Sequence, residues 1–196
     1  MRADLLSRIR QAKMDALSAK AIHQKRLNSY NFLNWLIDIF SLGVPISFYA
    51  AIILSNTPWV NSLNLIASTL LLILACVKLV GGYDNKVKTH IKYLAENIMV
   101  KEEAQNLVGE ANCSDERAQG FLKFAQSVEK PDSEFLSDRT ETERIFAYRE
   151  ALKEFDPSNP NPKCPSCGAN PWQFAQGSCQ MCGNTPIQKV TEKKNE

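Results

Sequence analysis

The chain has 196 residues, carries 23 Lys or Arg against 21 Asp or Glu, and has a slightly polar mean hydropathy. This length suits one domain, or a helical hairpin with small appendages. The charge is segregated, because residues 1–30 hold seven Lys or Arg against two Asp, whereas residues 102–156 hold fourteen acidic side chains against seven basic ones. Basic segments that flank an apolar region favour a membrane surface over nucleic acid as their partner.

Residues 1–31 are predicted to form a cytosolic amphipathic helix. Apolar side chains recur on one face at three-four spacing, at Leu5, Ile9, Ala12, Ala16 and Ala19. The stripe is rich in alanine, which favours packing against a neighbouring helix. A helix that lies on a membrane surface is the alternative.

Two long apolar stretches follow, at residues 32–54 and 60–80. We expect both to cross a membrane, since the first would span roughly 34 Å at about 1.5 Å per residue, against a hydrocarbon core of about 30 Å. Gly43 and Pro45 are expected to kink the first stretch. A hairpin buried in a soluble helical bundle is the alternative, and it is supported by the polar residues within both stretches.

Lys and Arg residues flank this expected hairpin on both sides, and the turn at residues 55–59 has none. By the positive-inside rule, this distribution places both termini in the cytoplasm. The sequence therefore predicts an all-α membrane protein, a multi-pass protein of the bacterial inner membrane whose first partner is the lipid bilayer.

Each expected span carries a polar stripe along one face. The two stripes consist of Asn34, Asp38 and Ser41 on the first span, and Asn61, Asn64 and Ser68 on the second. Polar groups in membranes usually face protein or water. The stripes are therefore candidates for an ion path in a homo-oligomer, with hydrogen bonding inside the hairpin as the alternative.

Asp38 and Lys78 form a candidate intramembrane ion pair. Each lies twenty residues from Pro58 at the turn, so an antiparallel hairpin would bring them to the same depth. Pairing would offset part of the cost of placing each charge in a membrane. In the alternative, Lys78 reaches headgroups and Asp38 reaches water independently.

Residues 85–156 are expected to form a cytosolic helical region. Thr140 and Glu143 have the spacing of a capping box, which would open a helix that continues to Phe155. Its expected core face consists of Ile145, Tyr148, Leu152 and Phe155. A proline-rich linker is predicted at residues 157–163 and a disordered tail at residues 184–196. His23 and His90 are isolated in the sequence and are expected at the surface.

Four cysteines near the C-terminus predict a zinc ribbon at residues 164–183. Cys164 and Cys167 form one C-x-x-C pair, Cys179 and Cys182 form the second, and eleven residues separate the pairs. Tetrahedral Zn²⁺ takes four thiolates in a closed structural site, and metal binding would supply the folding energy of so short a segment. Iron is not excluded by this spacing, and a thiol-redox pair is a weaker alternative.

The residues between the two cysteine pairs indicate what the ribbon contacts. Residues 169–178 contain no Lys or Arg, so no direct nucleic-acid binding is expected. Trp172 and Phe174 in this segment suit either contact with a protein partner or the ribbon's own small core.

The order of these parts resembles the SLATT domain, a two-transmembrane effector domain of bacterial conflict systems. The cysteine spacing, Cys164-x-x-Cys167, eleven residues, Cys179-x-x-Cys182, is similar to the pattern that names the mobilome CxxCx(11)CxxC protein family. The resemblance implies an effector carried on mobile elements that oligomerises and permeabilises the membrane after an infection signal. It implies no catalytic residues.

The sequence leaves two functional hypotheses. One is this antiviral, pore-forming effector of the inner membrane. The other is a non-enzymatic, membrane-anchored adaptor that recruits a cytosolic sensor or signalling protein through its ribbon and acidic helices. An enzyme is not expected, because no phosphate-binding glycine loop and no nucleophile with a recognisable partner are present.

Overall fold

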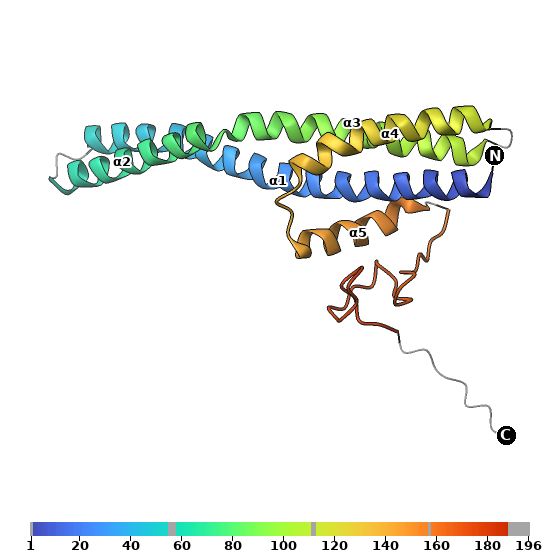
Figure 1. Cartoon of the computed structure of the whole chain (residues 1–196). Coiled ribbons are helices and arrows are strands. Elements are labelled where there is room, and N and C mark those ends of the chain that lie inside the picture. Colours follow the sequence, from blue (N-terminus) through green and yellow to red (C-terminus); the bar gives the residue numbers. More distant parts are fainter. Residues whose placement is uncertain (1, 55–57, 111–112, 157, 188–196) are drawn as a thin grey trace, which may run out of the picture. The chain divides into compact units, whose positions relative to one another are not determined.

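The computed structural model describes residues 2–54, 58–110, 113–156 and 158–187. Within these ranges the chain forms five helices and one isolated antiparallel bridge, between Gln176 and Asn184. The helices are α1 (Ala3–Leu54), α2 (Pro58–Gly81), α3 (Tyr83–Gly109), α4 (Asp115–Phe135) and α5 (Glu141–Phe155) (Figure 1). The expected separate elements at residues 1–31 and 32–54 thus meet in one continuous helix, which begins at Ala3.

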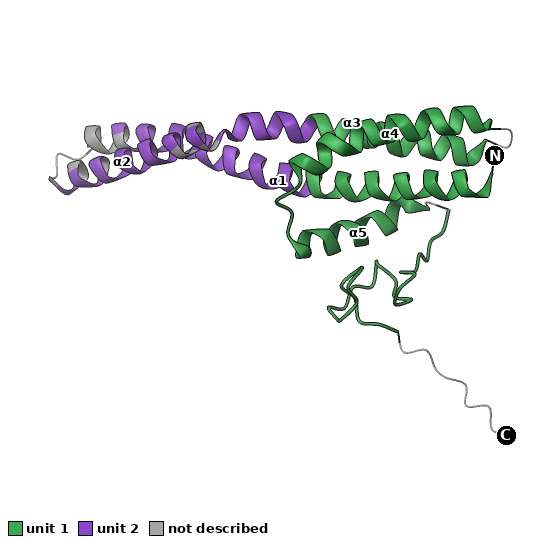
Figure 2. Cartoon of the chain, in the orientation of Figure 1, with its two compact units in different colours: residues 1–24, 92–196 green, residues 25–91 purple. Residues whose placement is uncertain are grey.

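The chain divides into two compact units, coloured separately in Figure 2. Unit 1 contains residues 1–24 and 92–196, and unit 2 contains residues 25–91. Both α1 and α3 contribute to both units. The cysteine segment belongs to unit 1, and the expected membrane hairpin belongs to unit 2.

Unit 1 has an apolar core between the first part of α1, the second part of α3, and α4. From α1 it contains Leu5, Ile9 and Ala16, which were predicted to line one face of this helix. They meet Val100, Ala104 and Leu107 of α3, together with Ala118, Phe121, Ala125 and Val128 of α4. The stripe of α1 therefore packs against neighbouring helices, because its small side chains allow them to approach closely.

Side-chain caps begin α4 and α5. Ser114 accepts a hydrogen bond from the Arg117 backbone N–H at 3.2 Å. Thr140 and Glu143 form the capping box expected from their spacing, since the Glu143 N–H donates to Thr140 Oγ1 at 3.2 Å and the Thr140 N–H donates to Glu143 Oε2 at 3.0 Å. These bonds satisfy N–H groups that have no partner inside the helix.

Helix α5 packs on α1 through a face that differs from the expected one. Ala147, Ala151 and Leu152 are buried, whereas Tyr148 and Phe155 are half-buried. The difference arises because alanine allows close helix approach, while larger side chains lie at the edge of the contact. Two lysines of α1 fix α5 at its C-terminal end: Lys13 Nζ donates to the Phe155 carbonyl at 2.6 Å, and Lys20 Nζ lies 2.5 Å from Glu154 Oε2.

Unit 2 is built from the rest of α1, from α2 and from the start of α3. Gly82 separates α2 from α3 with φ of +58°, a conformation that glycine adopts at little cost. Tyr30 contacts Tyr83 and His90, with ring centroids 5.6 Å apart in each pair. Contrary to expectation, His90 is buried here, and His23 is buried in unit 1.

No helix in the described residues combines the length and apolar character that crossing a membrane requires. The prediction of transmembrane helices at residues 32–54 and 60–80 is therefore wrong, and so is the multi-pass inner-membrane placement derived from it. A span depends on the mean hydropathy of a whole window. Asn34, Asp38 and Ser41 in α1 and Lys78 in α2 lower this mean.

The fold class is correspondingly all-helical, with a C-terminal cysteine cluster in place of the expected membrane architecture. The likeness to the SLATT domain rested on the two spans and loses its basis with them. What remains in unit 2 is a hairpin with many large exposed apolar side chains, among them Phe32, Trp35, Leu42, Leu65 and Leu72.

Candidate metal centre

Two similar backbone turns position the four cysteines. In the first turn, the Gly168 N–H donates to the Cys164 carbonyl at 2.8 Å, and in the second the Gly183 N–H donates to the Cys179 carbonyl at 2.8 Å. Both glycines have positive φ, +73° and +70°, which other residues adopt only with strain. Each C-x-x-C-G segment therefore folds into a knuckle that presents both of its sulfur atoms on one side.

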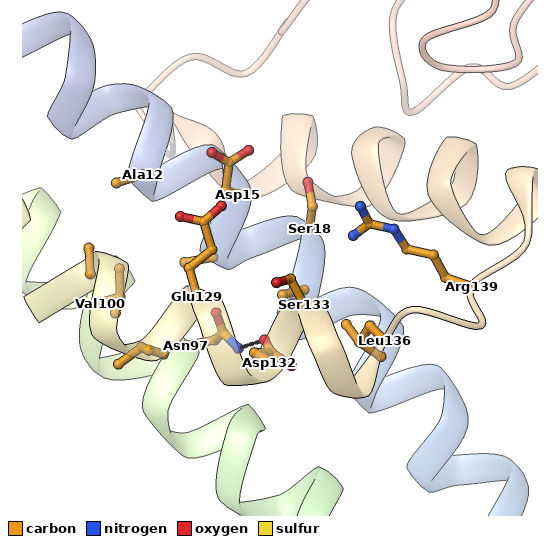
Figure 3. A pocket seen from close by; sticks show the side chains of 14 residues that line it. Ala12, Asp15, Ser18, Asn97, Val100, Glu129, Asp132, Ser133, Leu136 and Arg139 are labelled. Atoms are coloured by element: carbon orange, nitrogen blue, oxygen red, sulfur yellow. Dashed lines mark hydrogen bonds between the residues drawn. The ribbon is translucent and has the colours of Figure 1, made fainter.

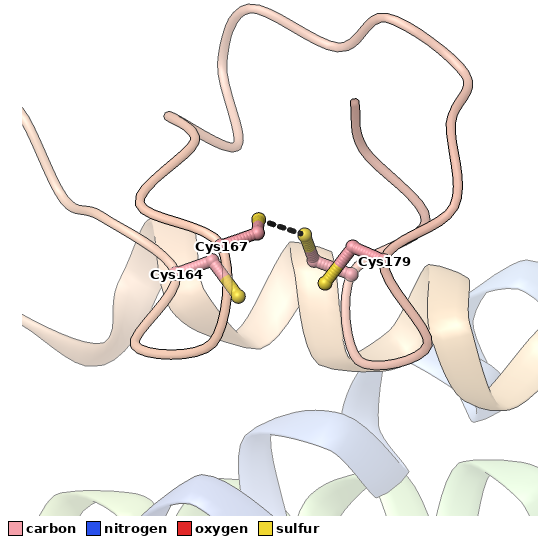
Figure 4. A group of neighbouring side chains, drawn as sticks. Cys164, Cys167 and Cys179 are labelled. Carbon is pink, nitrogen blue, oxygen red and sulfur yellow. Dashed lines mark hydrogen bonds between the residues drawn. The ribbon is translucent and has the colours of Figure 1, made fainter. Parts of the chain in front are cut away.

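The four sulfur atoms converge on a single point. The Sγ atoms of Cys164, Cys167, Cys179 and Cys182 all lie within 4.8 Å of one another. Figure 4 shows the first knuckle facing the second. Cys167 Sγ and Cys182 Sγ lie 3.5 Å apart. Four sulfurs bound at about 2.3 Å to one tetrahedral ion would lie about 3.8 Å apart. The cluster can thus hold a metal ion with little rearrangement.

The surroundings affect the thiols of Cys167, Cys179 and Cys182 in different directions. Burial opposes the ionisation of Cys179, but the backbone N–H groups of Cys182 and Met181 and the thiols of Cys167 and Cys182 lower its pKa to about 6. Burial raises the pKa of Cys167 and of Cys182. Backbone N–H groups that stabilise a thiolate are a usual support for metal ligands.

Asn184 organises the segment between the two knuckles, although its role was not evident from the sequence. Its side chain is buried, and its Oδ1 accepts from the N–H groups of Ala175 at 2.8 Å and of Thr185 at 3.1 Å. Its Nδ2 donates to the carbonyls of Asn170 and Gln173, each at 3.2 Å. The Asn184 amide therefore satisfies four backbone groups, in a segment with few backbone–backbone hydrogen bonds of its own.

The cysteine module, residues 164–187, packs against α5. Leu152 and Tyr148 of α5 and Met14 of α1 contact the cysteines. Burial, and after it the four cysteines, raise the pKa of Tyr148 to about 12. A Cβ atom at Gly183 would lie 2.6 Å from Ile145 Cγ2, so the second knuckle approaches α5 too closely for any larger residue.

The module also presents two aromatic side chains to solvent. Trp172 is 62% exposed and Phe174 is 47% exposed, so the alternative that they form the module's own core is wrong. Cations of α5 lie against both rings: the Arg149 guanidinium is 3.9 Å from the Phe174 centroid, and Lys153 Nζ is 5.1 Å from the Trp172 centroid. Such cation–π contacts fix rings that would otherwise rotate freely.

A buried polar network in unit 1 was also missed by sequence reasoning. Asp132 of α4 accepts from His23 of α1 at 2.7 Å and from Asn97 of α3 at 2.6 Å. The three side chains are 4% exposed or less. His23 also stacks on Tyr93 and Phe135. Because a lone histidine in a helical pattern carries no signal for its partner, only the tertiary fold reveals this network.

The residues expected to form a membrane path are described in part: Asp38 and Ser41 line one pocket together with Lys78. Asn34, Asp38, Ser41 and Ser68 are half-buried or exposed, and the side chains of Asn61 and Asn64 lie outside the described residues. The predicted ion path required membrane-spanning helices, and no described helix has the length and apolar character for this. The predicted pairing is present, since Lys78 Nζ lies 3.1 Å from Asp38 Oδ1, and the Asp38 side chain is 64% exposed. The predicted intramembrane setting fails, because neither helix, in its described residues, is apolar enough to span a membrane.

Comparison with known proteins places most of the chain in one family model. A family model described as "Mobilome CxxCx(11)CxxC protein" matches residues 7–185, which include all five helices at least in part and the four cysteines. No curated protein and no solved structure matches the chain.

Proposed function

Since the chain belongs to the mobilome CxxCx(11)CxxC protein family, we propose that it is a non-enzymatic adaptor whose metal-bound cysteine module recruits a protein partner. The observation that supports this proposal most is the exposed aromatic pair, Trp172 and Phe174. Each ring is in contact with a cationic side chain of α5. The word mobilome in the family's description supports a setting on mobile genetic elements.

We take the metal to be zinc. A site made of four thiolates leaves no open coordination position, which is typical of structural zinc and gives the ion no substrate to activate. Three of the four cysteines are buried, so water has little access to the ion. The metal would then be structural: it would hold the fold of the module and, through it, the positions of Trp172 and Phe174.

The charges around the aromatic pair favour a protein over a nucleic acid as the partner. Lys153 Nζ lies 2.8 Å from Glu150 Oε1, and Arg149 lies 3.6 Å from the same atom. One carboxylate therefore offsets much of the positive charge that phosphates would require. Exposed, fixed aromatic rings are typical of the energetic centre of protein interfaces.

A photo-crosslinking amino acid at position 172 tests this proposal in the full-length protein. We expect discrete adducts with a protein in the native host, and we expect the same adducts to disappear when Cys167→Ser releases the module. Position 124 is the matched control, because Phe124 is an exposed aromatic residue of α4 in the same unit. Equal adducts from both positions, or adducts that survive Cys167→Ser, would disprove recruitment by the module.

The hairpin of unit 2 supports a second part of the proposal, self-association. Its exposed apolar side chains form a surface of the kind that marks interaction sites. The described residues 31–82 carry two charged side chains, Asp38 and Lys78, and these pair with each other. The surface thus has no net charge to select an acidic or basic partner, and a second copy offers the same apolar surface in return.

Cys76 allows this self-association to be measured, because its thiol is exposed on α2. A short bis-maleimide should link two chains through Cys76, and Cys76→Ser should abolish the product. Ser127→Cys in the Cys76→Ser background is the control, since position 127 is exposed on α4 of unit 1. Equal dimer yields through positions 76 and 127 would exclude a specific interface between hairpins. So would purification of the full-length protein as a monomer with bound lipid.

A further inference from the structure

Unit 1 contains a cavity whose lining residues include none of the cysteine module. The cavity has a volume of about 160 Å³ and lies between α1, α3, α4 and the residues that follow α4 (Figure 3). It exists because α1 contributes small side chains to the wall, at Ala12, Ala16, Ser18 and Ala19. Pockets for drug-sized ligands measure about 300–1,000 Å³. The occupant of this cavity would therefore be small.

Side chains of opposite charge line this cavity but do not form ion pairs with one another. Asp15 of α1 and Glu129 of α4 contribute carboxylates, and Arg139 reaches in from the chain after α4. Within the described residues, no ion pair joins Arg139 to either carboxylate. Asp15 accepts instead from the neutral Gln11 amide, at 2.9 and 3.1 Å. Asp15 is half-buried, and Glu129 and Arg139 are exposed, so three charged side chains border one small space, and no ion pair within the described residues joins two of them.

The deeper polar residues of the cavity are already engaged. Both Asp132 oxygens accept hydrogen bonds, from His23 and from Asn97, so this carboxylate serves the core. Asp15 is different, because burial raises its pKa, and the hydrogen bond from Gln11 and the charge of Arg139 offset this only in part. A cationic group beside Asp15 would stabilise its ionised form.

We propose that the cavity binds a small zwitterion of the free amino acid class. Its ammonium group donates to the Asp15 and Glu129 carboxylates, and its carboxylate accepts from the Arg139 guanidinium. A molecule that carries both charges satisfies both ends of the cavity, whereas an amine or a carboxylic acid alone leaves one end unpaired. The binding site is independent of the adaptor function, since it uses neither the metal nor the aromatic pair.

Titration calorimetry on the full-length, metal-loaded protein tests this proposal with glycine, L-alanine and L-serine as probes. Ethylamine and acetate are the single-charge analogues, and we expect each to bind at least about tenfold more weakly than the amino acids. Arg139→Gln and Asp15→Asn should each weaken amino acid binding at least about tenfold. Lys130→Gln and Glu134→Gln make the same charge changes at exposed positions of α4 outside the cavity, and should leave the Kd unchanged.

Ala12→Leu gives a second, uncharged test, because position 12 is half-buried in the wall and leucine would fill the space. We expect this variant to keep its helical circular dichroism and to lose binding. Absence of heat from all three amino acids at millimolar concentrations would overturn the proposal. So would ethylamine binding as tightly as glycine, or binding that Arg139→Gln and Asp15→Asn leave unchanged.

Discussion

A chain that carries Cys167→Ser is expected to lose its metal and the fixed structure of residues 164–187, while its helices stay folded. Metal binding contributes about 10–16 kcal/mol to the folding of small zinc modules, and the described part of this module has one isolated bridge and no strand of its own. Three thiolates hold the ion far less well than four. The ratio of zinc to protein should fall well below one, and limited proteolysis should cut within the module.

Cys76→Ser is the matched control, because this cysteine is exposed on α2 and lies outside the cluster. It should retain the zinc content and the protease resistance of the parent protein. Full zinc retention in the Cys167→Ser chain would contradict a four-thiolate site. Cuts throughout α1 and α4 would show that the module also holds the helices together.

Asp132→Ala is expected to destabilise unit 1 by about 2–4 kcal/mol, since it removes an acceptor from two buried donors, and each lost acceptor costs about 1–3 kcal/mol. His23 is fully buried and donates to Asp132 at 2.7 Å, and Asn97 donates to the other oxygen at 2.6 Å. The substitution therefore takes one acceptor from each of two buried side chains, and Asn97 keeps its bond to the Tyr93 carbonyl at 2.9 Å. Urea unfolding, followed by helical circular dichroism, measures the change.

Glu134→Ala controls for loss of an acidic residue on the same helix, because Glu134 is exposed. It should change the free energy of unfolding by no more than about 0.5 kcal/mol. The double variant His23→Leu with Asp132→Leu should be less destabilised than the sum of the two single variants, because it removes both buried partners together. A loss below about 1 kcal/mol in Asp132→Ala would show that the network contributes little to the fold.

The metal site was the most predictable feature, because its geometry is local. The positions of Cys164, Cys167, Cys179 and Cys182 define two turns that each close over four residues, and glycine after each turn permits the required φ. The contact between Asp38 and Lys78 could also be predicted, because a short connection joins the two helices that carry them. Asp38 and Lys78 are equidistant from Pro58, and their side chains lie 3.1 Å apart.

Features that depend on distant segments could not be predicted. His23 and Asp132 are 109 residues apart, and nothing near either residue indicates the other. The segment around Phe174 has no basic residue, so the cation that covers its ring, Arg149, becomes visible only once α5 is placed. The predicted membrane spans fail for another reason: polar residues between the runs of leucine and isoleucine lower the mean hydropathy of both helices.

X-ray absorption at the zinc edge of the full-length protein tests the central claim most directly, namely that four cysteines of one chain hold one zinc ion. We expect four sulfur neighbours at about 2.3 Å and no lighter ligand. The Cys167→Ser chain should show fewer sulfur neighbours per zinc that remains. A spectrum with nitrogen or oxygen ligands in the parent protein, or a protein without zinc whose mass shows disulfides, would contradict the metal centre and the adaptor surface that depends on it.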